Sequence, residues 1–458
     1  MHTRRHVLFT GLATSLLAAC STMPSLADRP PIVFMHGNGD SAALWQTTIW
    51  RFESNGWPRE RLFALDQPMP LARDNDDVAQ PGRSSTAESM AFLQAEIDRV
   101  LKATGAGKVI LVGNSRGGNT IRNYVKHGGA AKVSHVVLGG NPAHGIWAIP
   151  GFNEQSEFSA LSTFLRQLNA PQGPNGDEVT PGVKWLTLRS DNNDKFAQPD
   201  GVWIGAPGKP THATHDGPAL KGATNLVLPR VDHRETSFSP AAFAATWQFL
   251  TGESPRRTDI ALESTVVLGG RVTGFGLSST DPASGQFTNN LPLVGAQLAV
   301  FETDPTTGVR KGDASHRQAI GADGRWGPFT AKAGAAYEFE IAAPGYATTH
   351  IYRSPFPRSS SIVHLRPDRI LPADREARAI VILTRPRGYF DAQRDTMRFD
   401  GQAVLPGVPP KGAGVSTSKI KLDSDGQRAI TGEFNGERVT GLTWPAAQGH
   451  MTLLELTY

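Results

Sequence analysis

The stretch that most constrains the fold of this chain is Lys108–Gly118, which reads KVILVGNSRGG. Its four consecutive apolar residues predict a buried strand of a parallel sheet. A G-N-S-R-G turn follows, and residues 119–126 predict a helix. A serine held in a tight turn between strand and helix needs small neighbours, and the two glycines supply them. The sequence therefore predicts a nucleophile elbow, with the Ser115 hydroxyl at the end of the strand and the Arg116 amide facing the same space.

Length and charge restrict the class of protein. A chain of 458 residues is expected to form two or three domains. Its formal net charge of +4 is spread along the chain without a basic run, so we expect no nucleic-acid partner. The sequence contains a single cysteine, which excludes disulfides within the chain and, beyond the N-terminal region, cysteine catalysis.

The N-terminal region has the features of an export signal. Residues 3–8 (TRRHVL) resemble a twin-arginine signal, and the apolar stretch that follows is too short to span a membrane. That stretch ends in L-A-A-C, which is similar to a bacterial lipobox, so we expect Cys20 to be lipidated after removal of the signal in residues 1–20. The alternative for Cys20 is a small buried hydrophobe. Residues 21–29 are expected to be a tether, and Ser21 favours the outer membrane, whereas an unused lipobox would give a periplasmic or secreted protein.

A second glycine-rich turn precedes the serine. Residues 30–35 (PPIVFM) predict a short strand that runs into H-G-N-G-D at residues 36–40. Such a turn leaves backbone N–H groups accessible to a developing oxyanion. The motif resembles the oxyanion loop of lipases and esterases in the α/β-hydrolase family, which implies the Asn38 amide as first donor and the Arg116 amide as second.

An acid follows the serine in the chain. Residues 183–189 (VKWLTLR) predict a buried strand, and the polar segment after it contains Asp191 and Asp194. A Ser-His-Asp triad needs a carboxylate at a strand end to hold the imidazole in the correct tautomer. Asp194 fits the pattern of that family best, and Asp191 stays open as the alternative. Either aspartate alone is also compatible with an Asx turn.

A histidine follows the acid. Residues 225–231 predict a last strand, short or at the sheet edge because of Pro229, and residues 240–251 predict a helix. His233 lies between them, where this fold places its base. His212 and His215 follow no strand, and their spacing lacks a third ligand, so we predict no metal site.

Together these motifs identify a resemblance. Residues 30–252 resemble an α/β-hydrolase of the bacterial lipase/esterase kind, which implies a doubly wound, mostly parallel sheet and acyl transfer through Ser115 without a metal or cofactor. Residues 146–180 interrupt the alternation of strands and helices, and we expect them to form a cap with a helix at 158–169. The alternative is an ordinary helix packed on the sheet. Arg116 departs from the family, where methionine, leucine or glutamine is common. Its side chain could face an acidic substrate or pair with a local carboxylate.

The composition changes after the polar linker at residues 253–259. Short alternating segments separated by turn residues predict all-β sandwich domains at residues 260–366 and 378–458. The first resembles a transthyretin-like, carboxypeptidase-regulatory-like module. The predicted strands are 264–272, 295–302, 337–342, 348–352, 361–365, 379–384, 415–422, 427–434 and 449–457.

The motifs predict a serine carboxylic-ester hydrolase, a lipase or esterase acting on lipid or acyl esters. The expected partners are an ester substrate and, through a lipidated N-terminus, a membrane. The alternatives are a polyester depolymerase or carbohydrate-ester esterase whose β half binds polymer, and an inactive cell-surface binding protein.

Overall fold

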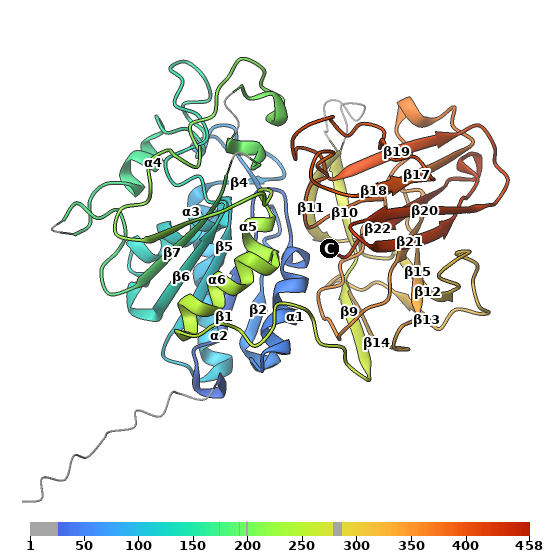
Figure 1. The fold of residues 1–458 in the computed structure, drawn as a ribbon, viewed down its shortest axis with the longest axis horizontal. Coiled ribbons are helices and arrows are strands. Elements are labelled where there is room, and N and C mark those ends of the chain that lie inside the picture. The colour runs from blue at the N-terminus through green and yellow to red at the C-terminus, as the bar shows by residue number, and fades with distance from the viewer. Residues whose placement is uncertain (1–25, 174, 192, 198–199, 278–285) are drawn as a thin grey trace, which may run out of the picture.

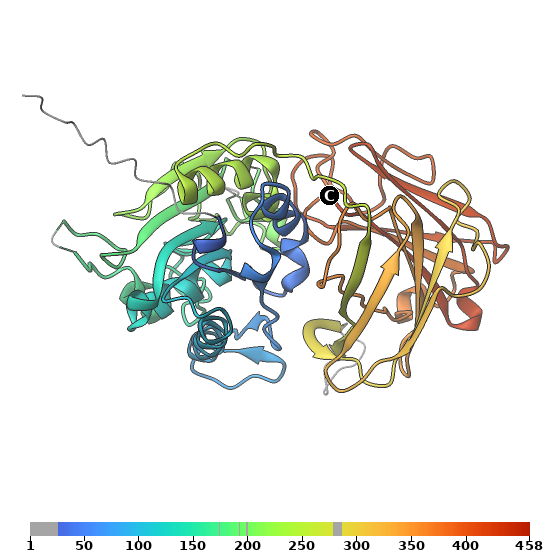
Figure 2. The same ribbon diagram turned by 90° about the horizontal axis from the view of Figure 1, so that it is seen from below.

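The computed structural model describes residues 26–458, with gaps at 174, 192, 198–199 and 278–285. A half made of helices and a parallel sheet lies beside a half made of strands (Figure 1), and the two remain side by side in the perpendicular view (Figure 2). The predicted signal and the Cys20 lipidation site lie outside the described residues. Over the residues that are described, every helix is too short or too polar to cross a bilayer.

The N-terminal half is built on a six-stranded sheet with the order β2-β1-β5-β6-β7-β8, and all its neighbouring strands pair in parallel. The strands are β1 (Ile32–Met35), β2 (Leu62–Ala64), β5 (Val109–Asn114), β6 (Val133–Gly139), β7 (Lys184–Ser190) and β8 (Thr224–Leu228). Strand β8 is at the edge, as Pro229 indicates. A short parallel pair, β3 (Leu71–Ala72) and β4 (Arg83–Ser84), lies outside this sheet.

Helices cover both faces of the sheet. Phe34 packs with residues of α1 (Gln46–Ser54) and α6 (Pro240–Thr251) in one buried cluster. Val33 packs with residues of α2 (Thr86–Thr104) and α3 (Arg116–Lys126) in another. Neighbouring strand residues point to opposite faces, so one apolar strand contributes to both clusters. The predicted doubly wound α/β fold is therefore confirmed.

The predicted cap contains less helix than expected. Within residues 146–180, the described part has one helix, α4 (Thr163–Leu168), in place of the predicted helix at 158–169. The rest is mostly loop, with a single bridge between Trp147 and Ser159. Ser162 limits the helix, because its side chain accepts a hydrogen bond from the Leu165 amide and so caps the N-terminus.

The C-terminal half contains a seven-stranded mixed sheet with the order β13-β12-β15-β16-β22-β17-β19. Its strands are β12 (Gln297–Thr303), β13 (His316–Ala319), β15 (Ala336–Ala342), β16 (Thr348–Arg353), β17 (Ala379–Thr384), β19 (Thr417–Leu422) and β22 (His450–Glu455). Strand β22 inserts between β16 and β17 and pairs in parallel with both. One sheet thus crosses the predicted boundary between 260–366 and 378–458, because buried β22 residues need partners on both sides.

Smaller sheets lie outside this one. They are β9 (Val266–Arg271) with β14 (Arg325–Ala331), β10 (Thr273–Leu277) with β11 (Gln286–Pro292), and β18 (Met397–Phe399) with β20 (Ala429–Phe434) and β21 (Glu437–Leu442). The predicted strand at 361–365 is wrong: this part of the chain makes only isolated bridges, such as Val272 with Leu365. Its backbone still bonds to β9, from the Val363 amide to the Gly269 carbonyl at 2.9 Å and from the Leu365 amide to the Arg271 carbonyl at 2.8 Å, and the side chains of Val363 and Leu365 are buried.

The two halves are packed against each other through α1 (Figure 1). Trp50 of α1 is fully buried in the hydrophobic core of the β half, and its Nε1 donates to the Ser359 carbonyl over 2.8 Å. Glu53, one turn further along α1, forms an ion pair with Arg358 at 3.0 Å. These buried contacts make the halves one packed unit.

Candidate active site

Ser115 lies between β5 and α3 in a backbone conformation that ordinary residues rarely adopt. Its φ of 52° and ψ of −121° are unfavourable for a residue with a Cβ. The surrounding glycines explain how the turn forms. A Cβ at Gly117 would lie 2.5 Å from the His36 carbonyl oxygen, and one at Gly113 would lie 2.7 Å from Ile121 Cδ1. The predicted strand, tight turn and helix are confirmed.

His233 and Asp194 are in direct contact. The Nδ1 of His233 donates to Asp194 Oδ2 over 2.8 Å, and both side chains are largely buried. The other carboxylate oxygen of Asp194 accepts the Phe196 amide at 2.8 Å, and the Phe196 ring packs edge-on against the imidazole with centroids 4.4 Å apart. This arrangement fixes both the position and the tautomer of the imidazole.

Asp191 faces a different part of the structure. Its Oδ2 accepts the Arg230 amide at 2.8 Å, and its Oδ1 accepts the Asn193 amide at 3.0 Å. The bond from the Asn193 amide is of the kind an Asx turn makes, and the bond from the Arg230 amide joins this turn to the segment after β8. Of the two predicted acids, the one that contacts His233 in this structure is Asp194.

The serine and the histidine are brought to the same edge of the sheet. Asn114, the residue before the serine, donates from Nδ2 to the His233 carbonyl at 3.3 Å and to the Ser237 hydroxyl at 2.8 Å. A Cβ at Gly140, just past the end of β6, would lie 3.1 Å from His233 Nδ1. The elbow and the His233 loop therefore meet at the carboxyl ends of the parallel strands, where such folds bind ligands.

The predicted oxyanion loop also runs beside the serine. A Cβ at Gly37 would lie 3.0 Å from the Ser115 Cβ. The Asn38 side chain is turned away, since its Oδ1 accepts the Ala72 amide at 2.7 Å. The Arg116 amide begins α3 and so has no acceptor within that helix. Both amides predicted to bind the oxyanion thus belong to segments that flank Ser115.

His36 has a structural role in this loop. Its Nε2 accepts the Gln67 amide at 3.1 Å, so the proton is on Nδ1, which lies 2.9 Å from the Gly37 carbonyl. Burial lowers the pKa of His36, and the hydrogen bond to that carbonyl only partly opposes the shift. A neutral His36 therefore holds the loop in place.

The Arg116 side chain pairs with a local carboxylate. It is almost fully buried, and its Nε lies 2.5 Å from Glu157 Oε1. Its terminal nitrogens donate to the Ser84 hydroxyl at 2.9 Å and to the Ser84 carbonyl at 2.8 Å. Burial raises the pKa of Glu157, and the charge of Arg116 opposes that rise. Glu157 belongs to the predicted cap, so this ion pair ties the cap to the elbow.

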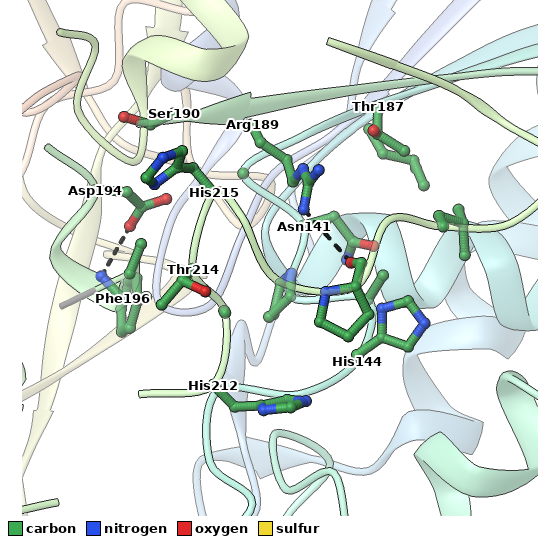
Figure 3. A pocket seen from close by; sticks show the side chains of 18 of the residues that line it. Asn141, His144, Thr187, Arg189, Ser190, Asp194, Phe196, His212, Thr214 and His215 are labelled. Carbon is green, nitrogen blue, oxygen red and sulfur yellow. Dashed lines mark hydrogen bonds between the residues drawn. The ribbon is translucent and has the colours of Figure 1, made fainter. Parts of the chain in front are cut away.

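A small cavity opens beside Asp194 (Figure 3). His212 and His215 line it from a loop, as does His144, whose Nε2 lies 3.0 Å from Glu178.

In the described part of the chain, the group of side chains close enough to share a metal ion is Glu338, Glu340 and His350 in the β half. The Arg310 guanidinium already lies between those two carboxylates, at 2.5 and 2.6 Å.

Comparison with known proteins agrees with this architecture. Residues 30–203 match the alpha/beta hydrolase fold, and residues 264–370 match the lipase C-terminal domain. The N-terminal half is an α/β-hydrolase fold. The second match covers most of the first β unit, for which the transthyretin-like module had been expected.

Solved structures similar to this chain include lipases. Aspergillus fumigatus lipase B is 14% identical, with 50% of this chain and 54% of that chain covered and a TM-score of 0.36. This chain thus spans about half the length of the fungal lipase. Bacillus licheniformis lipase BlEst2 in its propeptide form is 16% identical over 92% of this chain and 94% of that chain, with a TM-score of 0.36. The mature form of BlEst2 is 23% identical, with 49% of this chain and 93% of that chain covered and a TM-score of 0.34.

Sequence reasoning missed the charged residues that surround the His233 loop. Asp232 and Glu235 flank the histidine and contact Arg385 and Arg394 of the β half. The acidic flanks are visible in the sequence, but nothing local links them to arginines about 150 residues away.

Proposed function

We propose that this chain is a serine carboxylic-ester hydrolase of the lipase or esterase type, with Ser115 as nucleophile, His233 as base and Asp194 as acid. The observation that carries the proposal is the 2.8 Å contact between His233 Nδ1 and Asp194, at the same sheet edge as the strained serine. A histidine whose Nδ1–H is held by a carboxylate keeps Nε2 deprotonated, as a general base requires.

In this mechanism the Ser115 hydroxyl attacks the ester carbonyl while His233 takes its proton. The negative charge on the tetrahedral intermediate is stabilised by the backbone amides of Asn38 and Arg116. The imidazolium then protonates the leaving alcohol, and water hydrolyses the acyl-enzyme with His233 again as base. The chemistry requires no metal and no cofactor.

Lipid or acyl esters are the substrate class that we propose. The match of residues 264–370 to a lipase C-terminal domain supports it. The tight burial of Arg116 and Glu157 supports an uncharged acyl group, because their charges neutralise each other inside the protein instead of facing a ligand.

The test is turnover of p-nitrophenyl esters from acetate to palmitate, together with labelling by a fluorophosphonate. We expect turnover by the full chain and covalent labelling that disappears in Ser115→Ala. Absence of turnover at every chain length and absence of labelling would refute the proposal.

We also propose that the protein is exported and anchored to the outer membrane through a lipidated Cys20. The support is the L-A-A-C sequence after a short apolar segment with a twin arginine before it. If the lipobox is not used, the same signal gives a periplasmic or secreted enzyme.

A further inference from the structure

The loop that carries His233 is tied to the β half by Asp232. This carboxylate is fully buried, and its Oδ1 accepts the amides of Arg234 at 2.8 Å and Glu235 at 2.9 Å. Its Oδ2 accepts Arg385 Nη1 at 2.8 Å and the Tyr389 amide at 2.7 Å. One carboxylate therefore shapes the backbone around the histidine and joins that backbone to the C-terminal half.

Glu235 makes a second tie from the same loop. Its Oε2 accepts the Asp232 amide at 2.7 Å and Arg394 Nη1 at 2.5 Å, and its Oε1 accepts Arg385 Nη2 at 2.6 Å. Burial and the neighbouring Asp232 raise the pKa of Glu235, and the two arginines oppose that rise. The fully buried Asp232 and the partly buried Glu235 thus share two guanidinium groups, and each charge is compensated by hydrogen-bonded partners.

Arg385 is held rigidly from its own side. It follows β17 directly, and its side chain is 3% exposed. Its Nε donates to the Tyr458 carbonyl at 3.0 Å, and Nη1 also donates to the Tyr389 carbonyl at 2.7 Å. These bonds hold the guanidinium in place within the β half. Its bonds to Asp232 and Glu235 therefore restrict the position of the loop that carries His233.

The other loops of the candidate site also contact the β half. Asn290 donates from Nδ2 to the Asp40 carbonyl of the oxyanion loop at 2.8 Å. Lys195, next to the candidate acid, places its ammonium 4.7 Å from the Tyr389 ring centroid. Arg234 joins the base loop to the oxyanion loop through Asp40 at 2.9 Å, and its guanidinium lies 4.9 Å from the same ring.

We propose that the β half completes the active site, with Arg385 as a positioning residue that holds the His233 loop in its reactive geometry. This inference rests on the proposed ester hydrolase, because it says which residue keeps the base of that hydrolase, His233, in position. A shift of about 1 Å in a reacting group can cost about 10²-fold in rate, so a support that acts only through position still has a large kinetic effect.

Arg358 offers a matched control for simple docking of the halves. It is also a partly buried arginine of the β half, and it pairs with Glu53 at 3.0 Å and with Glu263 at 2.8 Å. Glu53 lies on α1 and Glu263 lies just before β9. Replacing Arg358 weakens the attachment of the halves at a place that carries no candidate catalytic residue.

The experiment compares Arg385→Gln, Arg385→Lys and Arg358→Gln in the full chain, with kcat, KM, Tm and the rate of fluorophosphonate labelling as readouts. For Arg385→Gln we expect kcat and the labelling rate to fall by about 10²-fold with KM within about twofold. Arg385→Lys keeps the positive charge but loses the planar guanidinium that binds two carboxylates at once, and we expect it to retain part of the kcat that Arg385→Gln loses. For Arg358→Gln we expect a lower Tm with kcat within about threefold.

Equal losses of kcat in the Arg385 and Arg358 variants, or an unchanged kcat in Arg385→Gln, would overturn the inference. If Arg385→Gln does not fold, Arg394→Gln removes the hydrogen bonds from Arg394 to Glu235 and to the Arg230 carbonyl but leaves Arg385 in place, and the same comparison with Arg358→Gln applies. An inactive, unlabelled wild-type chain would instead refute the proposed hydrolase. An active wild-type chain with an indifferent Arg385 would refute only the positioning role.

Discussion

Replacement of Asp194 by asparagine tests the candidate triad most sharply. The Oδ1 of Asp194 accepts the Phe196 amide at 2.8 Å, and the other oxygen accepts His233 Nδ1 at 2.8 Å. In Asp194→Asn the carbonyl oxygen keeps the bond to the Phe196 amide, so the NH2 group faces the imidazole. That donor stabilises the tautomer with the proton on Nε2, which cannot act as a base.

The expected cost is large because the base is lost while the fold is kept. A wrong tautomer in a Ser-His-Asp triad lowers kcat by about 10⁴-fold, which corresponds to about 5.5 kcal/mol of transition-state stabilisation. Asparagine has nearly the same shape as aspartate, so we expect Tm to change by only a few degrees. The assay is kcat and KM for p-nitrophenyl butyrate, with labelling of Ser115 as an independent readout.

Asp191→Asn is the matched control, because Asp191 follows the same strand, β7, as its first residue after the strand end. Its carboxylate accepts the Arg230 and Asn193 amides, and asparagine can keep one of those bonds. We expect kcat to stay within about fivefold of the wild type. A larger loss for Asp191→Asn than for Asp194→Asn would show that the assignment of the acid is wrong.

Three further predictions concern stability and export. Arg116→Met leaves Glu157 buried without its partner and should lower the free energy of unfolding in urea by about 3–5 kcal/mol; a loss below about 1 kcal/mol would contradict the buried pair. Burial alone raises the pKa of Asp66, but its ion pair with His364 holds that pKa well below the usual range. The contribution of Asp66 to the free energy of unfolding is therefore complete above about pH 4 and is lost as the pH falls further. Asp66→Asn should therefore flatten stability between pH 6 and pH 2, whereas an unchanged slope would reject the pair. Cys20→Ala should abolish palmitate incorporation, and persistent incorporation would refute the anchor.

Local sequence was enough to predict the elbow. The strand, the turn and the helix of residues 108–126 are confirmed because their determinants lie within a few residues of one another. The serine conformation depends on glycines two residues before and after it, where added side chains would collide with the His36 carbonyl or Ile121. The parallel sheet followed from the order of apolar segments and helices.

The sequence did not predict the direction in which the side chains of one loop point. Asp191 and Asp194 follow the same strand, and their patterns alone left both open as the acid. Packing made the difference, because Asp191 is drawn to the Arg230 amide while Asp194 lies between Phe196 and His233. The role of the Arg116 side chain was open for the same reason, since its partner Glu157 lies 41 residues away.

What the sequence by itself determined is the set of candidate groups and their order: a glycine-rich loop after β1, Ser115 after β5, two aspartates after β7 and His233 after β8. Only the tertiary structure decided how the β half relates to them. Strand β22 joins the two predicted β units into one sheet, and Arg385 reaches Asp232 across 153 residues. Such pairings depend on long-range packing, in which many distant residues are brought together at once, and no local pattern of residues specifies them.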